Sequence, residues 1–260
     1  MNETLPELRH HLERTVEIRA TRDVVFRYFT DSERFAAWWG SGSTIDARPG
    51  GAVRIRYPNA AEASGTVLEV IPPERIVFTY GYEGADPMFP PGGSRVTIAL
   101  EATPRGTRLT LRHDLPTEAA RDHHVQGWRY QLALFANVAA REAAAGAADV
   151  ADRFFALWSE ADAARRVAAL DQLTTDDIEF GDAFSATKGR QDLSEHIAGA
   201  QRFMPGIALK RNGAPRVCQG TALVDWTANG PDGSARGSGT NVFEFAADGR
   251  VRRVVGFWAG

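Results

Sequence analysis

Several features that mark common classes of protein are scarce or missing in this sequence. Its 260 residues include one cysteine, Cys218, so no disulfide can form within the chain, and no Cys/His cluster has the spacing of a zinc site. No stretch approaches the roughly 18 apolar residues of a membrane-spanning helix, and the polar residues 1–15 lack the apolar core of a signal peptide. We therefore expect a cytoplasmic protein with no membrane insertion and no bound metal.

Neither sign of charge is in excess, and the common catalytic motifs are missing. Lys and Arg total 30 against 33 Asp and Glu, a net charge of -3, which argues against nucleic acid as a partner. The sequence has no GxGxxG or P-loop glycine pattern, no HExxH, no GxSxG and no EF-hand loop. These absences argue against the usual nucleotide, zinc, serine-hydrolase and calcium chemistries, and we expect no cofactor.

The length and composition indicate two globular domains. With 43% hydrophobic and 24% charged residues, the composition is that of an ordinary folded protein. The small-residue stretch 139–148 continues a helix until Gly146, a residue type that commonly ends helices. We place the boundary there, with domains at residues 1–146 and 147–260. Whether the connection is a stiff helical spacer or a flexible one stays open.

The first half begins with short elements and ends with a long helix. Residues 15–20 alternate apolar and polar side chains like a half-buried strand, and Thr21 can cap the helix that follows. A second short helix is expected over residues 32–39, and turn signals divide residues 43–114 into an antiparallel meander. Residues 117–142 carry one apolar stripe at helical spacing. A sheet wrapped around such a helix often leaves a cavity.

The second half places its helices first and its strands last, which predicts an α+β domain. Helices are expected over residues 150–158, 163–173 and 189–203, and strands over residues 207–210, 214–219, 222–227, 239–245 and 251–258.

The first half resembles the START-like superfamily, in the SRPBCC branch related to the activator of heat-shock-protein-90 ATPase. The resemblance covers residues 12–142 and implies a helix-grip fold. It is carried by VFRYFTDSERFAAWWG (25–40), RPGGAVRIRY (48–57), SGTVLEVIPPERIVFTY (64–80), RGTRLTLRHD (105–114) and HVQGW (124–128).

The second half resembles the SnoaL-like members of the nuclear transport factor 2-like superfamily. This resemblance covers residues 147–260 and implies a cone-shaped α+β domain with a curved antiparallel sheet, which commonly pairs through that sheet into a homodimer. It is carried by ADRFFALWSEADAARRVAALDQLTTDDIEFGD (151–182), KGRQDLSEHI (188–197) and GTNVFEFAADGRVRRVVGFW (239–258).

These families include ligand carriers, drug-sequestering proteins, polyketide cyclases, isomerases, epoxide hydrolases and co-chaperones, so the fold does not choose between functions. The hypothesis we favour is a protein that binds a small apolar molecule, for carriage, sequestration or detoxification. One alternative is a cofactor-independent cyclase, isomerase or hydrolase acting in the SnoaL-like cavity. A second alternative is a co-chaperone-like regulator.

Aromatic side chains are numerous enough in both halves to line apolar pockets, although such residues also fill ordinary cores. His124 precedes Trp128 by one helical turn and therefore shares its inward face. The candidate ligand-binding residues are Trp39, Tyr57, Tyr80, His124 and Trp128 in the first half and Trp158, Phe180, Trp226 and Asn241 in the second.

The candidate catalytic residues, Asp182, Asp225 and His196, all lie in the second half. An apolar cavity would raise the pKa of a carboxylate and let it transfer protons. Strand alternation puts only one of Asp225 and Trp226 inside, and an inward Trp226 leaves Asp225 in solvent. Asp182 fits either a strand or a turn. His196 lies on a helix, where a structural role is also possible.

Overall fold

The computed structural model describes residues 7–259 and divides the chain into two compact units that meet between Ala139 and Ala140. Residues 1–6, which belong to the polar N-terminal stretch, lie outside the described residues. Gly146, our expected boundary, is the N-cap of helix α4 (Ala147–Ala156). A domain boundary at this glycine stays a prediction.

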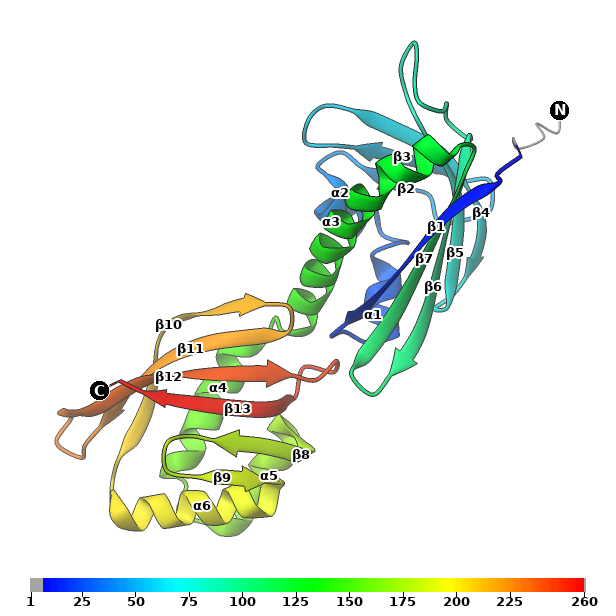
Figure 1. The fold of residues 1–260 in the computed structure, drawn as a ribbon. Coiled ribbons are helices and arrows are strands. Elements are labelled where there is room, and N and C mark those ends of the chain that lie inside the picture. The colour runs from blue at the N-terminus through cyan, green and yellow to red at the C-terminus, as the bar shows by residue number, and fades with distance from the viewer. Residues whose placement is uncertain (1–6, 260) are drawn as a thin grey trace. The chain divides into compact units, whose positions relative to one another are not determined.

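The first unit is built on a seven-stranded antiparallel sheet, with the spatial order β1-β7-β6-β5-β4-β3-β2. Figure 1 shows helix α3 running along one face of this sheet. The strands are β1 (His10–Ile18), β2 (Thr44–Ile45), β3 (Ala52–Arg56), β4 (Glu62–Ile71), β5 (Arg75–Tyr82), β6 (Ser94–Thr103) and β7 (Gly106–Leu115), and the helices are α1 (Arg22–Arg27), α2 (Ser32–Trp39) and α3 (Glu118–Ala143).

The two short helices begin at side-chain caps. The Thr21 hydroxyl accepts from the amide of Val24 at the start of α1, and Asp31 caps α2 in the same way. Gly40 ends α2 with φ at 146°, and a Cβ there would lie 2.2 Å from the carbonyl oxygen of Arg56. This close approach favours glycine and brings the end of α2 next to β3.

An aromatic cluster holds α3 against the two short helices. Phe135 of α3 is fully buried, and its ring centroid lies 5.7 Å from Tyr28, 5.0 Å from Phe29 and 4.8 Å from Trp38. Edge-to-face and tilted pairs at these distances stabilise the packing beyond the area that they bury. This part of α3 is thereby fixed against α2 and the residues that follow α1.

The second unit places three helices and a 3-10 turn against a six-stranded sheet of order β10-β11-β12-β13-β8-β9. Strands β13 and β8 pair in parallel, and the other neighbours pair antiparallel. The bounds are α4 (Ala147–Ala156), η1 (Leu157–Ser159), α5 (Ala163–Leu173), β8 (Thr174–Gly181), β9 (Ala186–Lys188), α6 (Arg190–Phe203), β10 (Ala208–Cys218), β11 (Thr221–Asn229), β12 (Ala235–Phe245) and β13 (Val251–Trp258).

The expected α+β class of both halves is confirmed, but the strands of the second half differ from those expected. Strands β8 and β9 were not predicted. Residues 207–210 and 214–219, expected as two strands, form the single strand β10, which has an irregularity between Asn212 and Arg216. The extra residues of a bulge let one strand continue through a stretch that reads as a turn.

Candidate functional site

A cavity in the first unit lies between α2, α3, strand β5 and the segment that follows β3. Its volume is about 490 Å³, inside the range of roughly 300–1,000 Å³ that is typical of small-molecule sites. The lining residues are Ala36, Ala37, Trp38, Trp39, Gly40, Tyr57, Pro58, Asn59, Tyr80, Tyr82, His123, His124, Gly127, Trp128, Tyr130, Gln131 and Leu134.

Helix α3 forms one wall of this cavity, and Gly127 leaves one position of that wall without a side chain. His123, Gly127, Tyr130 and Leu134 follow one another at steps of three and four residues, so they share one face of the helix. A Cβ added at Gly127 would meet no atom within 4 Å. The glycine therefore leaves open space between its neighbours on the helix.

The lining carries no permanent charge. Within residues 7–259, no Asp, Glu, Lys or Arg lines the cavity. Burial lowers the pKa of His124 below its ordinary value, and the nearby charge of His123 lowers it further, although a hydrogen bond to Ala120 acts in the opposite direction. Without carboxylate, ammonium or guanidinium groups, the cavity presents a largely aromatic surface with a few polar groups, which favours neutral ligands.

A buried histidine fixes Trp128 in the cavity wall. Trp128 donates its indole N–H to Nδ1 of His113 at 2.9 Å, and Nε2 of His113 lies 2.8 Å from the Ser94 hydroxyl. Because Ser94 donates its own proton to the carbonyl of Tyr80, Nε2 of His113 must be the donor in their contact. His113 is thus a neutral imidazole, and its burial lowers its pKa well below the ordinary value.

Three tyrosines and His124 form a polar cluster on one side of the cavity. The hydroxyls of Tyr57 and Tyr80 lie 2.6 Å apart, and the Tyr82 hydroxyl lies 3.0 Å from Nε2 of His124. Burial raises the pKa of Tyr57 and of Tyr80 well above the ordinary tyrosine value. The phenols of Tyr57 and Tyr80 therefore keep their protons and can act as both donors and acceptors.

The indoles that line this cavity differ in their hydrogen bonding. Trp38 donates to the carbonyl of Tyr28 at 3.4 Å, whereas the buried Nε1 of Trp39 has no partner among the described residues. The Trp39 ring packs edge-on against Tyr57 and Trp128. Aromatic packing rather than hydrogen bonding thus holds Trp39 in place.

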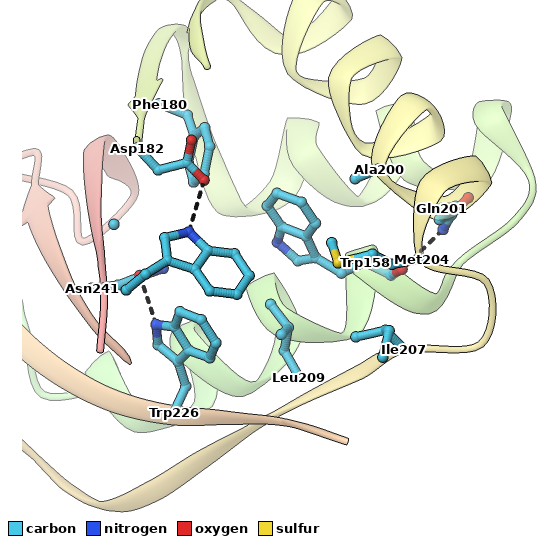
Figure 2. Close-up of a pocket in the computed structure, with 12 residues that line it drawn as sticks. Trp158, Phe180, Asp182, Ala200, Gln201, Met204, Ile207, Leu209, Trp226 and Asn241 are labelled. Carbon is cyan, nitrogen blue, oxygen red and sulfur yellow. Dashed lines mark hydrogen bonds between the residues drawn. The ribbon is translucent and has the colours of Figure 1, made fainter. Parts of the chain in front are cut away.

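The second unit has a smaller pocket, shown in Figure 2. Its volume is about 40 Å³, which is room for a few water molecules. The Trp226 indole donates to Asn241 at 2.8 Å, and the Trp226 and Trp258 ring centroids lie 4.9 Å apart. The lining residues are Trp158, Phe180, Asp182, Ala200, Gln201, Met204, Ile207, Leu209, Trp226, Asn241, Gly256 and Trp258.

Asp182 lines this pocket and also shapes the turn after β8. Its Oδ1 accepts from the backbone amides of Phe184 and Ser185 at 2.8 and 2.9 Å, and from the Ser185 hydroxyl at 3.1 Å. Its Oδ2 accepts from the Trp258 indole at 3.4 Å. One carboxylate oxygen is therefore occupied by the turn, and the other faces a tryptophan.

His196, Ser185 and Asp182 are linked, but not in the order that a nucleophilic serine needs. Nε2 of His196 lies 3.2 Å from the Ser185 hydroxyl, and the proton of that hydroxyl goes to Asp182. A histidine that activates serine must accept this proton, with the aspartate on its other nitrogen. Here His196 can only donate to Ser185, and its ring packs against Trp158 and Phe180.

The structure places Asp225 outside the pocket, so its selection as a candidate cavity residue is corrected. Trp226 is 3% exposed and faces the pocket, so strand alternation turns Asp225 to the opposite face of β11. There it accepts from Thr240 at 2.6 Å and pairs with Arg216 at 3.4 Å. Its side chain is about half exposed, so it cannot act as a carboxylate inside the pocket.

The structure brings the other candidates into two groups. Trp39, Tyr57, Tyr80, His124 and Trp128 all line the first cavity, and Trp158, Phe180, Asp182, Trp226 and Asn241 all line the second pocket. Sequence reasoning missed the aliphatic and amide residues of the second pocket, which come from α6, the segment after it and the first residues of β10. The apolar spacing of α6 could have indicated only those on the helix. The missed residues are Ala200, Gln201, Met204, Ile207 and Leu209.

Within residues 7–259, no group of three or more His, Cys, Asp or Glu side chains is placed to hold a metal ion. In the same range no helix combines the length and hydropathy needed to cross a membrane.

Comparison with protein families accounts for both units. Residues 19–140 match the family described as Activator of Hsp90 ATPase homolog 1-like protein, and residues 151–254 match the SnoaL-like domain. The chain therefore joins a START-like domain of the Hsp90-ATPase-activator type to a SnoaL-like domain, which confirms the resemblance read from the sequence. No match was found among functionally curated proteins.

Solved structures resemble one half of the chain at a time. A SnoaL-like family protein from Agrobacterium tumefaciens is 28% identical, with a TM-score of 0.41, over 43% of this chain and 96% of its own. Protein MLL2253 from Mesorhizobium loti is 20% identical, with a TM-score of 0.44, over 49% of this chain and 94% of its own. The Aha1 dimer from Colwellia psychrerythraea is 17% identical, with a TM-score of 0.41, over 47% of this chain and 90% of its own.

Proposed function

We propose that this protein binds a small, neutral, largely apolar molecule in the cavity of its START-like domain, for carriage, sequestration or detoxification. The observation that carries the proposal is the uncharged aromatic lining of a space of about 490 Å³. Apolar walls supply affinity through buried area, and a few polar groups on one side orient the ligand. Tyr57, Tyr80, Tyr82 and His124 are those polar groups.

The SnoaL-like pocket supports catalysis less well. Three indoles line its space of about 40 Å³, and a substrate would have to displace at least one of them. Of the candidate acids and bases, Asp225 faces solvent and Asp182 is bound by its own turn. The cyclase, isomerase or hydrolase alternative therefore lacks a free acid-base residue inside a substrate-sized space.

Thermal unfolding of the full chain with a panel of neutral aromatic compounds tests the proposal. A ligand that binds only the folded state stabilises it by about 2.7 kcal/mol at 100 times its Kd. We expect the unfolding transition of the START-like domain to move up with hits from the panel, while charged analogues of the same compounds have little effect.

The variant Gly127→Leu supplies the matched control, because a Cβ at this position of α3 would meet no atom within 4 Å. We expect the same compounds to lose their effect on this variant. The proposal fails if no compound raises the transition of the wild-type chain, or if wild type and variant respond alike.

We also propose that the SnoaL-like domain pairs with a second copy through its sheet. Leu223, Val242 and Val255 are register neighbours across β11, β12 and β13, and they form an apolar row on the sheet face opposite Trp226. Phe257, on the same face, is 58% exposed. Sedimentation velocity should show a dimer for the wild type and a monomer for Val242→Glu, and a monomeric wild type would contradict the pairing.

The proposed location is the cytoplasm. The free thiol of Cys218 is exposed and has no second cysteine in the sequence to pair with, which suits a reducing compartment. Fractionation of the native host, with the protein detected outside the cytoplasmic fraction, would contradict this assignment.

A further inference from the structure

We propose that Gln131 of α3 selects the ligand of the START-like cavity, because its side-chain carbonyl oxygen is held in one orientation and accepts a hydrogen bond from a ligand hydroxyl or N–H group. This inference rests on the proposed function, since it specifies the ligand class of the same cavity.

The orientation of the Gln131 amide is fixed by a backbone carbonyl. Its Nε2 donates to the carbonyl oxygen of Trp38 in the last turn of α2, where carbonyls have no donor within the helix. A carbonyl oxygen can only accept, so the amide nitrogen must face Trp38 and Oε1 must lie on the other side of the amide group. Both partners are held in place, since Phe135, one turn after Gln131, packs against the Trp38 ring at a centroid distance of 4.8 Å.

Oε1 of Gln131 borders the cavity and has no partner in the protein. The residue is 8% exposed and lines the cavity, and within residues 7–259 no group donates to its Oε1. Protein atoms do not enclose this oxygen either. In the described part of the chain, the enclosed side-chain polar atoms without a partner belong to Trp39, Trp158, Thr175 and Thr187. Oε1 therefore faces open space, which at Gln131 is the cavity that it lines.

Gly127 gives a ligand access to this oxygen. It lies four residues before Gln131, on the same face of α3, and a Cβ there would meet no atom within 4 Å. Trp38 and Trp128 also line the cavity, and their indoles offer flat apolar surfaces to an aromatic ring. A ring that packs against these walls can thus bring a polar group at its edge to Oε1.

An amide oxygen discriminates between ligands where a hydroxyl does not. The hydroxyls of Tyr57 and Tyr80 can donate or accept, so they pair with either kind of ligand group. Oε1 can only accept, so a ligand with just an ether or ketone oxygen would desolvate it without supplying a donor, which is costly. With no Asp, Glu, Lys or Arg around the cavity within the described residues, the class that fits is a neutral aromatic molecule with a hydroxyl or N–H group.

Calorimetric titration of the full chain with 2-naphthol and 2-methoxynaphthalene tests the inference, because the two probes share one ring system and differ in the donor hydrogen. We expect wild type to bind 2-naphthol about tenfold more tightly than the ether. Gln131→Met should reduce this ratio to about one or below, since methionine is unbranched like glutamine and its sulfur is only a weak acceptor. Tyr28→Phe is the control, because it also removes a hydrogen bond to a backbone carbonyl, that of Val138, at a residue that does not line the cavity. It should keep the wild-type ratio.

Gln131→Leu is a second variant without the acceptor, and it keeps the inference falsifiable if Gln131→Met folds poorly. Leucine is a good helix former and has no polar atom, so it should abolish the preference in the same way. The role of Gln131 is overturned if wild type binds both probes equally tightly, or if either folded variant keeps the wild-type ratio. In both cases the cavity still binds the probes, so the proposed function stands. If neither probe binds wild type, the proposed function fails and the role of Gln131 fails with it.

Discussion

Replacing Gly127 with leucine should separate the stability of the START-like domain from its ligand binding. Gly127 lies inside α3, lines the cavity, and has open space where a side chain would stand. Leucine is a much better helix former than glycine, and the exchange should stabilise the helix by about 0.8 kcal/mol. For a domain of this size that corresponds to roughly 3 °C in Tm.

The same side chain takes up space that a ligand needs. Forcing additional methyl groups into an occupied site costs about 1–3 kcal/mol, which is about a 5- to 150-fold weaker Kd. Most substitutions that abolish binding also destabilise the fold, so a rise in Tm together with a loss of affinity is a distinctive result. Differential scanning calorimetry and titration with 2-naphthol measure the two effects on the same preparation.

Gly199→Leu is the matched control, because Gly199 lies in α6 of the SnoaL-like domain and a Cβ there meets only Arg202 at 4.0 Å. It should stabilise its own domain and leave the 2-naphthol Kd unchanged. If Gly127→Leu binds 2-naphthol as tightly as wild type, the ligand does not occupy this cavity. If the variant lowers Tm, the space beside Gly127 is not open.

Three further predictions concern stability. Burial lowers the pKa of His113 in the folded chain, so the unfolded chain binds the proton more readily and stability falls as pH drops below 6.5. The loss should be about 1 kcal/mol between pH 6.5 and 5.5 in urea unfolding, and a flat profile would contradict the neutral imidazole. Gly239→Ala should destabilise the SnoaL-like domain by about 3 kcal/mol or more, because its Cβ would lie 2.6 Å from the Trp226 ring; an unchanged calorimetric transition would refute this. Asp225→Asn should change the unfolding free energy by less than about 1 kcal/mol, since its ion pair is exposed, and a larger loss would mean that this carboxylate has a role we have not assigned.

Local signals in the sequence predicted the short elements well. The bounds of α2 match the expected residues 32–39, and Thr21 caps α1, because a cap and an apolar spacing act within a few residues. Strand β1 begins at His10 rather than at residue 15, since its first residues are held by pairing with Leu115 and its neighbours in β7. Such distant pairing leaves no local pattern to read.

In the functional sites, too, local features were predictable from the sequence and contacts between distant residues were not. Aromatic residues were expected to line pockets because of their size and apolar surface, and strand alternation already indicated that an inward Trp226 would leave Asp225 in solvent. The polar cluster of the first cavity was not predictable, because Tyr57, Tyr80 and His124 come from separate parts of the chain that meet only in the fold. The small volume of the SnoaL-like pocket likewise depends on how three distant indoles pack together.

The most direct test of the central claim is a ¹H–¹⁵N spectrum of the indole N–H groups during titration with 2-naphthol. The chain has six tryptophans: Trp38, Trp39 and Trp128 line the START-like cavity, and Trp158, Trp226 and Trp258 line the SnoaL-like pocket. We predict that the signals of the first three shift and that those of the second three stay in place. Shifts confined to the SnoaL-like tryptophans, or no shift at all, would contradict ligand binding in the START-like cavity.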